Sequence, residues 1–157
     1  YEYDFLVLGG GGAGLVASKL ARGFGKKVLL IEKDKLGGEC TWTGCVPSKA
    51  IIKAGYAARI AKQLKQFGID TEEPLAFDTS RVMSCVRSVV QEIYATHTPE
   101  MIRSLGIDVQ CGDAQFLDNH HVILNGNTIS FDKAIITTGT HATIPPIEGL
   151  ETIPYLT

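Results

Sequence analysis

Two short apolar runs near the start of the chain predict the first strands. Residues 3–8 end at Gly9, and residues 28–31 end at Glu32. Runs of this length, closed by glycine or a polar residue, are typical of strands buried in a parallel sheet. Between them, residues 15–22 predict a helix that packs through small or apolar side chains at Leu15, Ala17, Leu20 and Ala21.

Two longer helices follow. Residues 48–67 carry an apolar residue every fourth position and end before Gly68, which fits a C-terminal cap. After a turn at residues 71–74, Asp78 or Thr79 can cap the next helix. We interpret both aliphatic stripes as core; their members are Ile52, Tyr56, Ile60 and Leu64 in the first and Val82, Val86, Val89 and Ile93 in the second.

The second half of the chain predicts strands. Thr98-Pro99 interrupts the last helix, and its continuation stops at Gly106. Residues 107–116 begin a β-rich stretch, and Asn125-Gly126 predicts a hairpin with a type I′ turn. Residues 133–138 predict a buried strand that ends at Gly139.

A glycine-rich loop joins the first strand to its helix. Gly9, Gly11 and Gly14 satisfy the GxGxxG pattern, with Gly12 and Ala13 between them. The three glycines allow a tight turn, close approach to a pyrophosphate and close packing of helix on strand. Free N–H groups at the helix N-terminus then face the phosphates. A solvated glycine-rich surface loop is the alternative.

An acidic residue completes the nucleotide pattern. Glu32 ends the second strand, 18 residues after Gly14, where it can accept hydrogen bonds from a ribose and repel a 2′-phosphate. Lys33 beside it is a further candidate contact. A phosphate-binding P-loop is excluded, because Leu15 occupies the position where that motif needs lysine. The parts together predict an α/β, Rossmann-like domain with a central parallel sheet and a small antiparallel β-meander.

Cys40 and Cys45 are the candidate reactive groups. Five positions apart, they would diverge by roughly 140° on a regular helix, so a disulfide between them needs a distorted turn, which Gly44 can supply. Pro47 suits a first helical turn and places Cys45 at or just before a helix N-terminus, where partial positive charge favours a thiolate. Two cysteines buried as small hydrophobes are the alternative.

The spacing between motifs favours one cofactor. The cysteine motif follows the second strand by about eight residues, so the far end of a bound dinucleotide is expected beside it. A flavin exchanges electrons with a disulfide through an adjacent thiolate, which a nicotinamide alone rarely does. We therefore favour FAD.

The sequence GGECTWTGCVPSK at residues 37–49 resembles the redox-disulfide motif of the pyridine nucleotide-disulfide oxidoreductases, which include dihydrolipoamide dehydrogenase and mercuric reductase. Residues 134–139 and 145–150 resemble the family's second signature, with Thr137 where alanine is usual. Glu39 stands in place of the commonest threonine, and Trp42-Thr43 in place of Asn-Val. We expect these departures to touch substrate or flavin.

The resemblance implies a mechanism. NAD(P)H would reduce FAD, which would pass two electrons to a Cys40-Cys45 disulfide. Cys45 would be the thiolate next to the flavin, and Cys40 the thiol that attacks a small-molecule disulfide or binds a soft metal ion. Lys49 would stabilise the reduced flavin. Further backbone contacts to FAD implied by position in the family pattern are Gly38, Cys40, Ala114, Thr138 and Gly139.

The resemblance leaves several readings open. The residues Thr41-Trp42-Thr43 favour a substrate like that of mercuric reductases, and dihydrolipoamide dehydrogenase is the alternative. A flavin-dependent monooxygenase or oxidase without a redox disulfide competes as a class, and a non-catalytic nucleotide-binding module is the third possibility.

The family's greater length sets the expected domain organisation. Residues 1–150 would be the first segment of an FAD domain, and residues 151–157 the start of a crossing to an absent NAD(P)H domain. Alone, the segment is expected to lack turnover and to hold FAD weakly. The full-length parent is expected to be a cytoplasmic homodimer.

Composition narrows the remaining classes. The 157 residues include 15 basic and 17 acidic side chains, so a formal charge of −2 favours neither nucleic acid nor a membrane as partner. We interpret Cys85 and Cys111 as free core thiols. The histidines lack metal-ligand spacing, because His120 and His121 should point to opposite faces of an extended stretch, so we assign no metal site.

Overall fold

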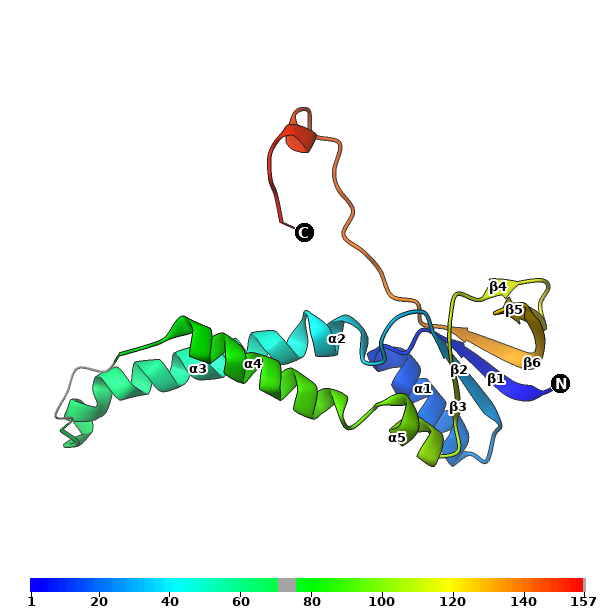
Figure 1. Cartoon of the computed structure of the whole chain (residues 1–157), viewed down its shortest axis with the longest axis horizontal. Helices are drawn as coiled ribbons and strands as arrows, with labels where there is room; N and C mark the ends of the chain where they lie inside the picture. Colours follow the sequence, from blue (N-terminus) through cyan, green and yellow to red (C-terminus); the bar gives the residue numbers. More distant parts are fainter. Residues whose placement is uncertain (71–75, 157) are drawn as a thin grey trace.

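The computed structural model describes residues 1–70 and 76–156. Within them, one sheet has the strand order β3-β2-β1-β6-β5-β4 (Figure 1). The parallel part comprises β3 (Asp108–Cys111), β2 (Val28–Glu32), β1 (Tyr3–Leu8) and the second half of β6 (Asn127–Ile136). The first half of β6 pairs antiparallel with β5 (His121–Leu124), which pairs with β4 (Gln115–Phe116). The predicted parallel sheet with an antiparallel meander is confirmed.

The second half of β1 and nearly all of β2 are buried, as their continuous apolar sequence predicts. One face packs against α1 (Gly12–Gly23) and α5 (Pro99–Ser104), through a core that includes Val7, Leu15 and Ile102. The other face packs against the meander, through a core that includes Leu6 and Phe131. Two cores therefore hold the ends of β1 and β2 in fixed positions.

Helix α1 buries a narrower stripe than the sequence predicted. Gly14, Leu15, Ser18 and Ala21 are buried, whereas Leu20 is 60% exposed, so its predicted packing role is wrong. At 100° per residue, Leu20 lies about 200° around the helix from Ser18 and faces away from the sheet.

Two antiparallel helices form an arm that extends from the sheet (Figure 1). The arm consists of α3 (Cys45–Gln63), the 3₁₀ helix η1 (Leu64–Phe67) and α4 (Thr79–Tyr94). Gly68 ends η1 in a left-handed conformation, and the Asp78 carboxylate accepts hydrogen bonds from the amides of Ser80 and Arg81, so both predicted caps are confirmed. The turn predicted at residues 71–74 lies outside the described residues.

The predicted core stripe of α3 is wrong. All of α3 is described, and none of its side chains is buried; Ile52 is 69% and Tyr56 63% exposed. On α4, Val86 and Val90 are buried, whereas Ile93 is 40% exposed. Each helix of the arm packs mainly on the other, so only the seam between them is covered.

The meander is close to its prediction. Asn125 and Gly126 have φ values of 51° and 80°, the positive pair that a type I′ turn requires. Thr98 caps α5 by accepting a hydrogen bond from the Met101 amide, and Gly106 ends the helix region at φ 79°. The predicted strand at residues 133–138 is part of one longer strand, β6, which begins at Asn127, ends at Ile136 and also forms the second arm of the hairpin. Its predicted burial is wrong, because Ile136 is 64% exposed and Ala134 is also exposed.

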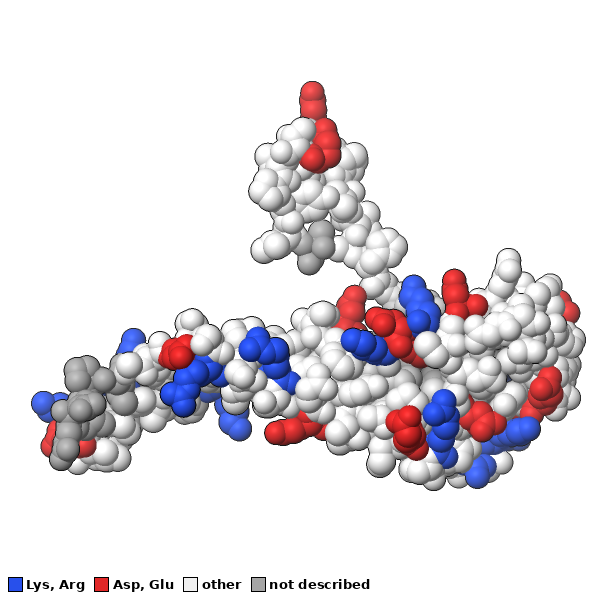
Figure 2. All heavy atoms as spheres, viewed as in Figure 1, with Lys and Arg blue, Asp and Glu red and all other residues white. Residues whose placement is uncertain are grey.

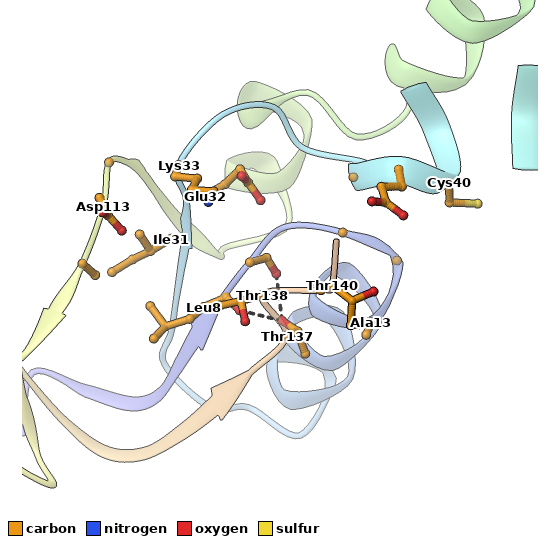
Figure 3. Close-up of a pocket in the computed structure, with 18 residues that line it drawn as sticks. Leu8, Ala13, Ile31, Glu32, Lys33, Cys40, Asp113, Thr137, Thr138 and Thr140 are labelled. Carbon is orange, nitrogen blue, oxygen red and sulfur yellow. Dashed lines mark hydrogen bonds between the residues drawn. The ribbon is translucent and has the colours of Figure 1, made fainter. Parts of the chain in front are cut away.

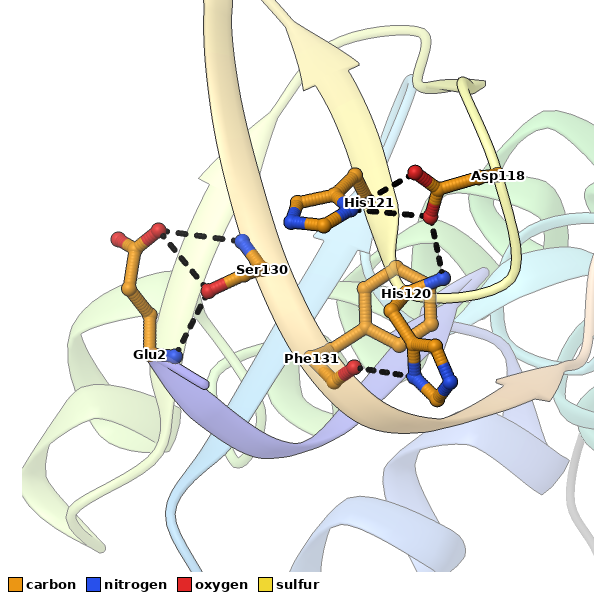
Figure 4. Close-up of polar contacts among 6 residues, drawn as sticks. All are labelled: Glu2, Asp118, His120, His121, Ser130 and Phe131. Carbon is orange, nitrogen blue, oxygen red and sulfur yellow. Dashed lines mark hydrogen bonds and ion pairs between the residues drawn. The ribbon is translucent and has the colours of Figure 1, made fainter.

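Polar contacts fasten the N-terminus and the meander together (Figure 4). The Glu2 carboxylate accepts a hydrogen bond from the Ser130 amide at 3.1 Å, and the Glu2 amide donates to Ser130 Oγ at 2.9 Å. His121 Nδ1 lies 2.9 Å from the Asp118 carboxylate, which also accepts from the His120 amide at 2.7 Å. The His120 ring has a different partner, because its Nδ1 lies 3.1 Å from the Phe131 carbonyl oxygen on β6.

Beyond β6 the chain leaves the body of the molecule (Figure 1). It runs without regular structure to the short η2 (Leu150–Thr152). Figure 2 shows acidic and basic side chains interspersed on the visible face of the body and the arm. Among the described residues, no helix is long and apolar enough to cross a membrane. Cys85 and Cys111 are exposed, so their prediction as core thiols is wrong.

Candidate functional site

A cavity of about 450 Å³ opens at the carboxyl ends of β1, β2 and β6 (Figure 3). Five short segments line it: the turn after β1, the end of β2, the start of α2, residues 112–114 and residues 137–140. The structure thus brings together nearly all of the predicted site residues, namely Gly9, Gly11, Gly12, Ala13, Glu32, Lys33, Gly38, Cys40, Ala114, Thr138 and Gly139. Gly14, Cys45 and Lys49 do not line this cavity.

The turn after β1 is compact because its glycines touch backbone. Gly9 has φ 97°, and a Cβ there would collide with the Thr137 carbonyl oxygen. A Cβ at Gly14 would collide with the Gly9 carbonyl oxygen, so Gly14 serves packing rather than the cavity wall. Gly12 has open space where its Cβ would be, at the start of α1. The free amides of this helix N-terminus border the cavity and suit an anionic pyrophosphate.

Glu32 is held in place at the end of β2. Its Oε2 accepts a hydrogen bond from the Gly10 amide at 2.6 Å, and its Oε1 accepts one from the Asp34 amide at 2.9 Å. Each oxygen keeps further lone-pair capacity toward a ligand. A fixed carboxylate beside a free helix N-terminus fits the ribose and pyrophosphate of a dinucleotide such as FAD.

Thr137 gives the cavity wall a contact that alanine could not. Its hydroxyl lies 2.8 Å from the Leu8 carbonyl oxygen and 2.9 Å from that of Gly9, so it bridges the end of β6 to the turn after β1 (Figure 3). The departure from alanine is visible in the sequence but this contact is not, because nothing local to Thr137 indicates which carbonyls lie opposite it.

The two cysteines are brought together by a break between helices. The short helix α2 (Gly38–Trp42) carries Cys40, and Cys45 is the first residue of α3, as predicted. The amides of Thr43 and Gly44 both donate to the Glu39 carbonyl oxygen, at 3.0 and 2.6 Å. This tight turn returns the chain and brings Cys45 close enough to Cys40 to affect the pKa of its thiol.

The cysteine pair is accessible and its thiols interact. Both are exposed free thiols, and only Cys40 lines the cavity. The hydrogen bond with Cys45 raises the pKa of the Cys40 thiol above its usual value, with desolvation and the Cys45 charge adding to the effect and the Lys49 ammonium opposing it. Lys49 therefore acts on the pair electrostatically from one turn further along α3. The predicted order, with Cys45 next to a flavin, stays a prediction.

The two departures in the cysteine motif face different ways. Glu39 lines the cavity, as expected of a residue that touches a ligand. Trp42 instead packs inward: its indole N–H donates to the Leu36 carbonyl oxygen at 2.9 Å, and its ring lies 4.8 Å from that of Tyr94. Trp42 does not line this cavity, because its aromatic ring packs α2 on α4, and its expected contact with substrate or flavin stays a prediction.

Comparison with known proteins identifies the family. Residues 3–156 match the family model described as pyridine nucleotide-disulphide oxidoreductase. The chain belongs to this family. Family members depend on FAD, with NAD(P)H as the substrate of the full-length enzymes. The glycine turn and the fixed Glu32 carboxylate described above fit such a cofactor.

Relatives within the family carry two names. The chain is 33% identical to a dihydrolipoyl dehydrogenase of Acholeplasma laidlawii over 96% of its length, and 38% identical to one of Bacillus subtilis over 94%. It is 32% identical to a mercuric reductase of Bacillus cereus over its whole length. It spans 44%, 31% and 25% of these three relatives, respectively.

His97 is a site-adjacent residue that the sequence analysis missed. It is buried, and its Nε2 lies 3.3 Å from Thr41 Oγ1, next to Cys40. A single histidine outside any motif gives no local signal of this contact. The described residues contain no group of three or more His, Cys, Asp or Glu side chains placed to hold a metal ion.

Proposed function

We propose that residues 1–150 form the first segment of the FAD domain of an NAD(P)H-dependent disulfide oxidoreductase, and that residues 151–157 begin the crossing to its NAD(P)H domain. The observation that supports this best is the cavity that joins the glycine turn and Glu32 to Cys40. Family membership favours this class over a monooxygenase or oxidase without a redox disulfide.

Each part of the cavity has a proposed task. Gly11, Gly12 and Ala13 would hold the pyrophosphate through the amides of the α1 N-terminus. Glu32 would accept hydrogen bonds from the ribose, with Lys33 beside it. The cofactor, when bound, supplies the passage of two electrons between NAD(P)H and the cysteine pair.

The remaining predicted contacts lie on three other segments that line the cavity. The backbone at Gly38 and Cys40, and at Ala114, would border the cofactor where α2 and the loop after β3 approach it. Thr138 and Gly139 would do the same from the end of β6. A Cβ at Gly38 would lie 2.9 Å from the Gly11 Cα, so glycine at this position lets the start of α2 lie close to the turn after β1.

The thiols would perform the exchange. In the pair with one proton removed, Cys45 would take up the remaining proton as Cys40 attacks one sulfur of a substrate disulfide, forming a mixed disulfide and expelling one substrate thiolate. The Cys45 sulfur then attacks Cys40, forming the Cys40–Cys45 disulfide and releasing the second thiol. Lys49 would stabilise negative charge on the pair, consistent with its effect on Cys40.

The substrate is proposed by class, as a small-molecule disulfide or a soft metal ion. Soft thiolates suit both chemistries. The preference for a mercuric-reductase-like substrate rests on Thr41-Trp42-Thr43, and the inward packing of Trp42 removes much of its basis. Lipoamide, the disulfide form of dihydrolipoamide, therefore stands beside mercuric ion as the candidate electron acceptor, and parallel assays of the full-length protein with each decide between them.

The proposal is tested by removing Cys45. In the full-length protein with bound flavin, Cys45→Ser is expected to abolish the long-wavelength thiolate-to-flavin absorbance and to lower NAD(P)H-driven turnover at least a hundredfold. Cys85→Ser is the matched control, because Cys85 is an exposed thiol on α4 that lies outside the cavity. Wild-type absorbance and turnover in Cys45→Ser would refute the proposal.

A further inference from the structure

The five-residue helix α2 depends on neighbouring elements for its position. A helix this short does not form by itself, because nucleation fixes several residues for very few hydrogen bonds. Its only buried residue is Thr41, which directly follows Cys40. The contacts of Thr41 therefore decide where the Cys40 thiol lies.

Thr41 contacts the buried His97, which is linked by hydrogen bonds through Thr96 to the end of α4. His97 Nδ1 lies 3.2 Å from Thr96 Oγ1, and the Thr96 hydroxyl donates to the Ile93 carbonyl oxygen at 2.7 Å. Since that hydroxyl has one proton, it accepts from Nδ1–H. In the neutral imidazole Nε2 is then the acceptor, and the Thr41 hydroxyl donates to it at 3.3 Å.

The same pair supports the link between the cysteine helix and the turn after β1. Gly37 has φ 104°, and a Cβ there would lie 2.6 Å from Thr41 Oγ1 and 2.7 Å from His97 Nε2. The Gly37 amide donates to the Gly10 carbonyl oxygen at 2.8 Å. The buried Thr41–His97 pair thus packs against Gly37, the residue that links α2 to the turn after β1.

An aromatic contact closes the arrangement on its other side. The Trp42 ring packs on Tyr94, and Tyr94 meets the His97 ring edge-on with centroids 5.8 Å apart. Thr41 and Trp42 are both turned inward by these contacts. Cys40, the residue before them, is left on the cavity side of α2.

From these contacts we propose that Thr41 and His97 are positioning residues for the redox pair, holding α2 so that the Cys40 thiol stays against Cys45. This inference rests on the proposed function of the two cysteines. Holding two reacting sulfurs together raises their effective concentration and favours the disulfide. Loosening α2 therefore weakens the disulfide relative to the dithiol.

The test measures the disulfide directly. Full-length wild type and variants are equilibrated in dithiothreitol redox buffers, acid-quenched, alkylated, and scored for the Cys40–Cys45 disulfide by mass spectrometry. Thr41→Val keeps the shape of the side chain but removes the donor, and is expected to lower the equilibrium constant for disulfide formation about tenfold, a rise of about 30 mV in reduction potential.

Two further variants separate positioning from general stability. Thr41→Ser restores the hydroxyl and is expected to return the constant to within about twofold of wild type. Thr79→Val makes the same change at an exposed residue that begins α4, about 22 Å along the helix axis from Tyr94, and is expected to have no effect. A folded Thr41→Val protein with the wild-type constant would overturn the inference.

A second pair keeps the test decisive if Thr41→Val does not fold. His97→Gln can keep an acceptor near the position of Nε2, whereas His97→Asn is too short to reach Thr41. Asn is expected to weaken the disulfide several-fold more than Gln, and equal constants would overturn the inference. A wild-type protein that forms no Cys40–Cys45 disulfide in oxidising buffer would instead refute the proposed function.

Discussion

At the residue scale, neighbouring glycines of the turn after β1 differ in how strictly glycine is required. Gly14 packs against the backbone of Gly9, whereas Gly12 borders open space. The GxGxxG pattern predicted these positions because each requirement is local to the strand-turn-helix unit. His97 could not be predicted in this way, because its partner Thr41 is 56 residues away in the sequence.

The difference between the two glycines gives a stability prediction. Gly14→Ala is expected to destabilise the protein by about 1–3 kcal/mol, because the new methyl group collides with the Gly9 carbonyl. Gly12→Ala, the matched control, is expected to be neutral or to stabilise by less than about 1 kcal/mol. Urea denaturation measures both, and equal midpoints for the two variants would contradict the packing role of Gly14.

His97 gives a pH prediction. Burial, with a smaller contribution from the Lys19 charge, lowers the pKa of His97 below its ordinary value of 6.5. Above pH 6.5 both the folded and unfolded states hold a neutral imidazole. As the pH falls below 6.5 the unfolded state binds the proton first, so stability is lost from there down through the lowered folded pKa.

His97→Gln removes this titration. The difference in unfolding free energy between wild type and His97→Gln is expected to be constant above about pH 7 and to shift in favour of the variant between pH 6.5 and 5. Denaturation at several pH values provides the measurement. A difference that stays constant down to pH 5 would show that the His97 pKa is the same in both states.

At the element scale, the arm shows what periodicity can and cannot predict. The four-residue repeat of α3 correctly predicted a helix, and Gly68 and Asp78 correctly predicted its end and the start of α4. Periodicity does not say what covers an apolar stripe, however. Ile52 and Tyr56 are exposed because α4 lies along a different side of α3.

The two helices of the arm are therefore expected to respond differently to substitution. Val86→Ala on α4 removes buried methyl groups and is expected to cost about 2 kcal/mol. Tyr56→Ser on α3 is expected to change stability by less than about 0.5 kcal/mol, because the ring is already largely in water. Thermal or urea denaturation of this 157-residue chain compares them, and a larger loss for Tyr56→Ser would show that its ring is covered.

At the scale of the whole molecule, the sequence predicted a central parallel sheet and most of the residues that line the cavity, because each strand and turn is marked by a short local pattern. It did not predict the strand order. The sequence also did not predict how these elements pack on one another. The hydrogen bonds of Thr137, the inward packing of Trp42 and the exposure of Cys85 and Cys111 were all missed. Each depends on which side of an element meets its neighbour.

The segment after β6 gives a prediction for the whole chain. Residues 138–148 are exposed and lack regular structure. Exposed irregular backbone is the preferred site of proteolytic nicking. Brief treatment of the 157-residue chain with proteinase K is expected to cut there first and leave a product that retains its far-UV circular dichroism. First cuts within β1 or α1, read by mass spectrometry, would contradict the described fold.

Strand β6 is shared by the antiparallel meander and the parallel sheet, and so connects them rigidly. Its first half is bonded to the meander and its second half to β1, without a break between Asn127 and Ile136. A twist applied at the hairpin therefore travels along covalent backbone to the rim of the nucleotide cavity. Any hinge that lets the C-terminal portion swing must lie past Ile136, and Gly139, with φ 74°, is the first glycine it meets.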